Sequence, residues 1–148
     1  MLSQIRTATA GLTPLFTAGH SEIQLTEGML NVDLDRFLSE LEAGKLPLGL
    51  SDTVENFTSF LVDFQSIGDD FETWASNLRQ SAEKRAITAL VKISNADAVD
   101  HKGRLQAAQA AFHIDNFDKS AARAIMRGFA DLNEISKAIE FYDELCAN

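Results

Sequence analysis

The chain has 148 residues, of which 45% are hydrophobic and 24% charged, and its formal net charge is −9. A chain of this size and composition can bury its own core, which argues against wholesale disorder. The single cysteine, Cys146, can form neither an intramolecular disulfide nor a cysteine zinc site. No apolar stretch reaches the roughly 18 residues that a membrane span needs. We therefore expect one soluble domain, residues 1–148, located in the cytoplasm or within a virion particle.

The first third of the chain has a short and broken pattern. Both prolines and five of the eight glycines precede residue 50, so residues 1–30 are expected to form an irregular arm ahead of a helical body at 31–148. Alternating apolar residues around Glu27-Gly28 indicate a short β-hairpin near 22–34. A helix over 31–43 competes with the second half of that hairpin, and we favour the helix. Its apolar face would hold Leu34, Phe37, Leu38 and Leu41.

After residue 50, apolar residues recur with helical spacing. The expected helices run from Asp52 to a break at Ile67-Gly68, over 69–94, 97–113 and 118–129, and from Ile135 to Leu145. Asp52 with Glu55, Asp97, and Asp131 with Glu134 are read as helix starts. The connections are two to five residues long, which is usual between antiparallel neighbours. The predicted fold is an all-α bundle of four to six amphipathic helices with an irregular N-terminal arm.

The predicted inner faces account for nearly all of the aromatic residues. The long helix over 69–94 is expected to bury one face along its whole length, formed by Phe71, Trp74, Ala75, Leu78, Ala82, Ala86, Ala89, Leu90 and Ile93. The inner face of the last helix is expected to hold Ile135, Ala138, Ile139, Tyr142, Leu145 and Cys146. Phe60 is the exception, because it points away from the stripe formed by Val54, Phe57, Leu61 and Phe64.

Charge is divided along the chain. Residues 22–78 hold twelve acidic and two basic residues, residues 79–127 hold nine basic and five acidic ones, and residues 128–148 hold five acidic residues and one lysine. Two explanations are open. The charged helix faces are simply solvated or adjacent within the fold, or they are complementary across a subunit boundary, where charge sets register and association rate. The second explanation predicts oligomers that are sensitive to salt.

No pattern of an active site is present. The chain lacks the G-x-S-x-G nucleophile elbow and both glycine-rich phosphate loops. Asp97 and His101 are four residues apart, but two ligands are fewer than a zinc site takes, and a helix cap beside an exposed histidine explains them. A helix-turn-helix around Gly128 would place Asp131 and Glu134 against phosphates, so DNA binding is disfavoured. We predict that the protein is not an enzyme and has no catalytic residue, metal ligand or cofactor.

The favoured function is a non-enzymatic protein–protein interaction protein, either a small structural subunit or an assembly factor of a larger complex such as a phage particle or a bacterial machine. The alternative is an acidic inhibitor or immunity-type protein that blocks a basic site on its partner. The partner is expected to be another protein or a second copy of the chain. The candidate interface residues are apolar residues of the N-terminal segment, the off-stripe aromatic and charged helix positions: Leu12, Leu15, Phe16, Ile23, Leu25, Phe60, Asp69, Asp70, Arg79, Lys84, Arg85, Arg123 and Arg127.

Overall fold

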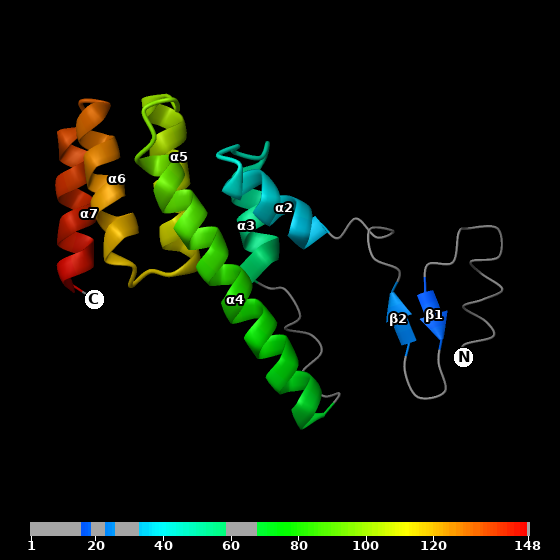
Figure 1. Ribbon diagram of the computed structural model, residues 1–148. Coiled ribbons are helices and arrows are strands. Elements are labelled where there is room, and N and C mark those ends of the chain that lie inside the picture. The colour runs from blue at the N-terminus through cyan, green and yellow to red at the C-terminus, as the bar shows by residue number, and fades with distance from the viewer. Residues whose placement is uncertain (1–15, 19–22, 26–32, 59–67, 148) are drawn as a thin grey trace. The chain divides into compact units, whose positions relative to one another are not determined.

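The structure is a computed structural model of the chain. It describes residues 16–18, 23–25, 33–58 and 68–147. The chain forms two compact units, Met1–Arg36 and Phe37–Asn148. Six helices contain most of the described residues, and one short β-ribbon precedes them (Figure 1). The predicted all-α class is therefore confirmed. Whether residues 1–148 act as a single domain with an arm stays a prediction.

The ribbon in the first unit differs from the predicted hairpin near 22–34. Strand β2 (Ile23–Leu25) pairs in antiparallel fashion with β1 (Phe16–Ala18), which precedes it, so that Phe16 lies opposite Leu25. At Leu34, where the second half of that hairpin competed with the favoured helix, the chain is helical, because the following apolar residues have helical spacing and are buried on one side of a helix. Residues 26–32 lie outside the described part of the chain.

Helices α2 (Asp33–Glu42) and α3 (Leu50–Thr58) follow. The predicted helix over 31–43 is confirmed in α2, which buries Phe37, Leu38 and Leu41. Helix α3 begins two residues before the expected start, so Asp52 lies in its first turn instead of capping it. An acidic side chain is favourable there too, because the first turn carries unsatisfied backbone N–H groups.

The long helix α4 (Asp69–Ser94) has the predicted bounds, but only part of its predicted inner face is covered. The C-terminal half buries Ala82, Ala86, Ala89, Leu90 and Ile93, whereas Trp74 is 54% exposed and lies against Phe71 with ring centroids 5.3 Å apart. The cause is length. A helix of 26 residues is about 39 Å long, whereas α5 and α6 have 14 and 13 residues and are about 20 Å long. The N-terminal half of α4 therefore extends past them (Figure 1).

Helix α5 (His101–Ile114) is the most enclosed helix and packs against α3, α4 and α6. Its buried residues are almost all small, which lets neighbouring backbones approach closely: Gly103, Leu105, Ala107, Ala108, Ala110 and Ala111. The expected start at Asp97 is wrong. The N-cap is Asp100, whose carboxylate accepts a hydrogen bond of 2.7 Å from the N–H of Gly103, and the residues before it form turns.

Helices α6 (Lys119–Asp131) and α7 (Ile135–Ala147) complete the second unit. The predicted start of α6 is confirmed, because the Asp118 carboxylate accepts a 2.7 Å hydrogen bond from the N–H of Ala121. The predicted cap at Asp131 is wrong. Asp131 ends α6, and Asn133, with a φ of 59°, forms the left-handed turn that separates the two helices.

An apolar cluster joins α5, α6 and α7. Its buried centre consists of Leu105, Ala108, Ala124 and Ile125, and its half-buried edge of Phe112, Phe129, Leu132 and Phe141. The contacts run from α4 to α5, from α5 to α6 and from α6 to α7, while α4 also contacts α6. No helix in the described part of the chain is long and apolar enough to cross a membrane.

Gly128 marks a close approach of α6 to α5. A Cβ atom at this position would lie 3.0 Å from Cδ1, 3.1 Å from Cβ and 3.3 Å from Cα of Leu105. Replacement of a helical glycine by alanine usually stabilises a protein. Here we expect Gly128→Ala to lower the free energy of unfolding by about 1 kcal/mol, because the Leu105 backbone must move. Chemical denaturation measures this change. The control Ser120→Ala, at an exposed position of α6, is expected to be neutral or slightly stabilising, and equal effects of the two substitutions would contradict the prediction.

An ion pair links α2 to α4. Nε of Arg85 donates a 2.8 Å hydrogen bond to Oε1 of Glu42, which lowers the pKa of the Glu42 carboxyl below its ordinary value of 4.5. A lowered pKa in the folded state means that the pair stabilises the fold above pH 4.5. This contribution is lost as the pH falls through the folded-state pKa.

In Arg85→Gln, we expect the pKa of Glu42 to rise towards 4.5, as measured by NMR titration of the carboxyl carbon. The exposed base Lys84 on the same helix serves as control, since Lys84→Gln removes the same charge without removing the hydrogen bond. An unchanged pKa in Arg85→Gln would show that the contact is absent in solution.

Candidate interaction surface on the C-terminal helix

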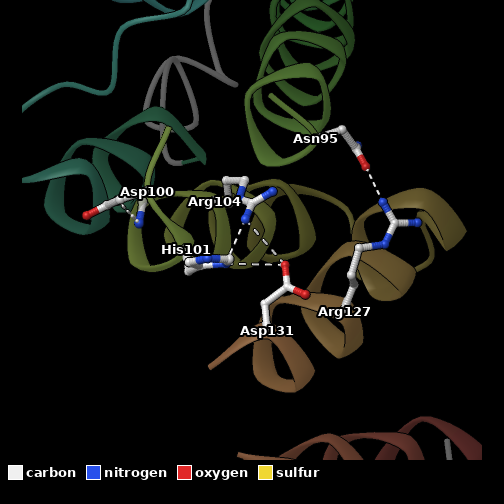
Figure 2. Close-up of polar contacts among 7 residues, drawn as sticks. Asn95, Asp100, His101, Arg104, Arg127 and Asp131 are labelled. Atoms are coloured by element: carbon white, nitrogen blue, oxygen red, sulfur yellow. Dashed lines mark hydrogen bonds and ion pairs between the residues drawn. The ribbon is translucent and has the colours of Figure 1, made fainter. Parts of the chain in front are cut away.

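A polar network fastens the ends of three helices to one another (Figure 2). The guanidinium of Arg104 lies between His101 and Asp131, with its Nη2 atom 2.6 Å from Nδ1 of His101 and 3.4 Å from Oδ2 of Asp131. Because arginine can only donate, Nδ1 of His101 accepts in this contact. Nη1 of Arg127 donates a 2.7 Å hydrogen bond to Oδ1 of Asn95, directly after α4.

The contact of Arg104 with Asp131 joins α5 to the end of α6, and that of Arg127 with Asn95 joins α6 to the end of α4. The Arg104 side chain is only 18% exposed. We therefore assign the network a structural role, which is to hold α4, α5 and α6 in register. His101, weighed above with Asp97 as a metal ligand, is thereby placed beside a cation. Among the described residues, no group of three or more His, Cys, Asp or Glu side chains is arranged to hold a metal ion.

A groove of about 670 Å³ lies between the α2–α3 connection and α5. One wall is apolar and includes Leu46, Pro47 and Leu48, and the last of these side chains is fully exposed. The opposite wall is the outer face of α5, with Gln106 and His113 among its lining residues. The groove thus has an apolar wall and a polar wall. It is one of two candidate surfaces of this unit, and the other is on α7.

The other candidate surface is the outer face of α7, a helix in which no residue is fully buried. Its inner face is held by Phe141, whose ring meets that of Phe112 edge to face, with centroids 5.2 Å apart and an interplanar angle of 74°. Its outer face carries Ile135, Ile139 and Tyr142, which are 51%, 56% and 54% exposed. Spacings of four and three residues place these side chains in one line along the helix. We call these three residues the apolar stripe.

The apolar stripe corrects the predicted inner face of α7. The prediction placed Ile135, Ile139 and Tyr142 inside, but α7 lies at the edge and packs mainly against α6. Because Phe141 turns inward to reach Phe112, the side of the helix about 120° away must face outward. One neighbouring helix cannot cover both sides of so broad an apolar arc.

Cys146 is also exposed, contrary to the prediction, and lies one turn after Tyr142. The pKa of Tyr142 is raised above its ordinary value of 10.0, mainly because its side chain is hydrogen-bonded to that of Cys146. The phenol is therefore neutral throughout the physiological pH range. The apolar stripe consequently carries no charge of its own.

The charge beside the apolar stripe is negative. Glu140 and Asp143 are exposed, and each follows a stripe residue by one position, so both lie along the same edge of the stripe. Lys137, the one basic residue of α7, is bound to Glu134 by an ion pair of 3.0 Å. The outer face of α7 is therefore an apolar line with an acidic edge, and exposed apolar patches on folded proteins commonly mark contact sites.

The thirteen residues predicted for the interface do not form one described surface. Leu12, Leu15 and Phe60 lie outside the described residues, and the positions 16, 23 and 25 belong to the β-ribbon. Nothing in the structure tests these six as contact residues. They remain predictions.

The predicted charged positions are spread over α4 and α6. Asp69 and Asp70 are exposed in the first turn of α4, Lys84 is exposed further along, and Arg79 is half-buried. Arg85 and Arg127 bind Glu42 and Asn95, so both are used within the chain. Arg123 is exposed on α6. Sequence reasoning missed the apolar stripe, although the width of the apolar arc in α7 was a signal that one neighbour would leave part of it uncovered.

Comparisons with protein-family models, with curated proteins and with solved structures find no match to this chain.

Phe141 and Tyr142 are adjacent aromatic residues with opposite roles, which provides a matched test of how α7 is held. We expect Phe141→Ala to lower the free energy of unfolding by about 2 kcal/mol and to raise amide exchange throughout α7, because the contact with Phe112 is lost. Tyr142→Ala removes an exposed ring and is expected to leave exchange in α7 nearly unchanged. Hydrogen exchange followed by mass spectrometry measures both variants, and greater exchange in Tyr142→Ala would contradict this assignment of faces.

Proposed function

We propose that this protein is a non-catalytic protein–protein interaction protein, a small structural subunit or assembly factor of a larger complex such as a phage particle or a bacterial machine. In this proposal the helices form a bundle, and the outer face of its last helix is a contact surface. The observation that supports it is the apolar stripe: three large side chains in one line on a helix, each more than half exposed.

An exposed apolar stripe favours association, because removing apolar surface from water lowers the free energy. Full burial of a large apolar side chain is favourable by about 1.5–3 kcal/mol, so covering three half-exposed side chains is worth roughly 3 kcal/mol in total. This is too little for a stable complex by itself, since specific interfaces bury about 800 Å² on each partner. The apolar stripe is therefore proposed as the centre of a larger contact, with the acidic edge at Glu140 and Asp143 selecting a basic partner surface.

The alternative function, an acidic inhibitor or immunity-type protein, draws support from a different feature. The first turn of α4 presents Asp69, Asp70 and Glu72 next to the exposed ring of Trp74. An acidic and aromatic helix end of this kind suits a basic site on another protein. A monomer that binds one basic target tightly would favour this alternative, whereas association through α7 favours the structural role.

Ile139→Glu tests the proposed function directly. The substitution places a charge in the middle of the apolar stripe at a position already in water, so the fold is expected to persist. Wild-type protein is expected to show a mass above the 16.2 kDa of one chain by size-exclusion chromatography with light scattering. Ile139→Glu is expected to run as a monomer, because covering a charged side chain opposes association.

Gln80→Glu is the matched control, because it adds the same charge at an exposed position of α4. It is expected to associate like the wild-type protein. A wild-type chain that remains monomeric between about 0.1 M and about 1 M salt, where the Debye length falls from about 10 Å to about 3 Å, would refute self-association. In that case the inhibitor function becomes the better explanation.

A further inference from the structure

The apolar stripe leaves open which surface covers it. One other exposed apolar side chain of the second unit, Phe117, is followed by basic residues whose charge is opposite to that of the acidic edge of the stripe. We propose that Phe117 of one copy docks on the apolar stripe of a second copy, so that the chain assembles head to tail. This inference rests on the proposed function and names the partner as a second copy of this chain.

Phe117 is the tip of the turn between α5 and α6 and is 84% exposed. The turn holds it in place, because the N–H of Phe117 donates a 2.9 Å hydrogen bond to Oδ1 of Asp115 and the N–H of Asp118 donates to the carbonyl of Asp115 at 3.2 Å. The Asp118 carboxylate in turn caps α6. An aromatic ring is thus presented to water by an ordered backbone, and little conformational entropy is lost when it docks.

Two exposed bases lie close to Phe117 in the chain, and their charge is opposite to that of the acidic edge of the apolar stripe. Lys119 and Arg123 follow Phe117 on α6, are four residues apart and therefore share one exposed face. The two nearby carboxylates, those of Asp115 and Asp118, are already used as hydrogen-bond acceptors within the turn. Asp115 and Asp118 keep their negative charge, so the basic side of the ring is limited to the face of α6 that carries Lys119 and Arg123.

The acidic edge of the apolar stripe offers the matching charges. Within the described residues, no ion pair is formed by the two bases beside the ring or by the two acids beside the stripe: Lys119, Arg123, Glu140 and Asp143. Docking Phe117 on the stripe would bring the bases of one copy to the acids of the next. Such complementarity fixes the register of a contact and raises its association rate.

A second copy is favoured over the same copy, because Phe117 and the apolar stripe are both exposed in one chain and so do not cover each other. An antiparallel symmetric contact of stripe with stripe is disfavoured, since it would bring the acidic edges of two copies together. The two surfaces are different patches of one chain, so their contact is heterologous. It continues as an open chain of copies or closes as a ring.

The experiment is complementation between two variants, measured by size-exclusion chromatography with light scattering. Phe117→Ser removes the aromatic ring but keeps the apolar stripe. Ile139→Glu keeps the ring of Phe117 but places a charge in the apolar stripe. Each variant alone is expected to be monomeric, with association weakened about tenfold or more. An equimolar mixture is expected to form a one-to-one dimer of twice the 16.2 kDa chain mass and nothing larger, because each pair has one intact contact and no free complementary surface.

Charge reversal provides the second measurement. Arg123→Glu is expected to weaken association at about 0.1 M salt, and adding Asp143→Arg in the same chain is expected to restore it, because each contact again pairs opposite charges. Circular dichroism confirms that each variant is folded. Phe117→Leu, which keeps an apolar tip, is expected to associate nearly like the wild-type protein.

Three results would overturn the inference in distinguishable ways. In the first, the wild-type protein and Phe117→Ser both associate, whereas Ile139→Glu is monomeric. This result would exclude Phe117 as the docking group but leave the proposed function standing. A mixture of the two variants that stays monomeric would exclude the heterologous contact. A wild-type monomer at every salt concentration would refute both the inference and the self-assembling form of the proposed function.

Discussion

The packing of three helices around α5 is the constraint on which the rest of the second unit depends. A helix with neighbours on several sides can be approached closely only if its contact residues are small, and α5 meets α3, α4 and α6 largely through alanine and glycine. A close approach is at Gly128 of α6, where a single added carbon would lie only 3.0 Å from the Leu105 side chain. The polar contacts of Arg104 and Arg127 fasten the same helices at their ends, so packing and hydrogen bonding specify one arrangement.

A central helix that is enclosed in this way leaves its neighbours at the edge. Helix α4 is about twice as long as the helices it packs against, so its N-terminal half keeps Trp74 in water. Helix α7 has one principal neighbour and a broad apolar arc, so Phe141 is used inside while Ile139 and Tyr142 face outward. The proposed interaction surface is therefore a geometric consequence of how the core is built, and it lies on a helix that its inner aromatic contact holds in place.

The tertiary structure divides the charges of the chain into two groups. Arg85 binds Glu42 and Arg104 binds Asp131, so part of the basic segment is used within the fold, as the simpler explanation of the charge pattern expected. Exposed ion pairs of this kind add little stability, and they leave the question of assembly open. The exposed bases beside Phe117 and the exposed acids beside the apolar stripe form the second group, and these charges are the ones on which an intermolecular contact would depend.

The sequence by itself determined the all-α class and most helix positions, because helical periodicity and start signals are local: the bounds of α4 and the cap at Asp118 follow from residues within a few turns. Competing local signals misplaced the start of α5, where Asp97 and Asp100 are both capable caps and the turns that follow α4 select the second. The ribbon register and the direction in which α7 faces were decided only by tertiary structure, because periodicity shows that a helix has an apolar face but not how much of that face a neighbour covers. The apolar stripe was missed for this reason: an apolar side chain at helical spacing has the same local pattern whether a second helix lies over it or water does. Phe117 lies in the turn between α5 and α6 and belongs to no periodic pattern, so only the tertiary structure shows that it is exposed.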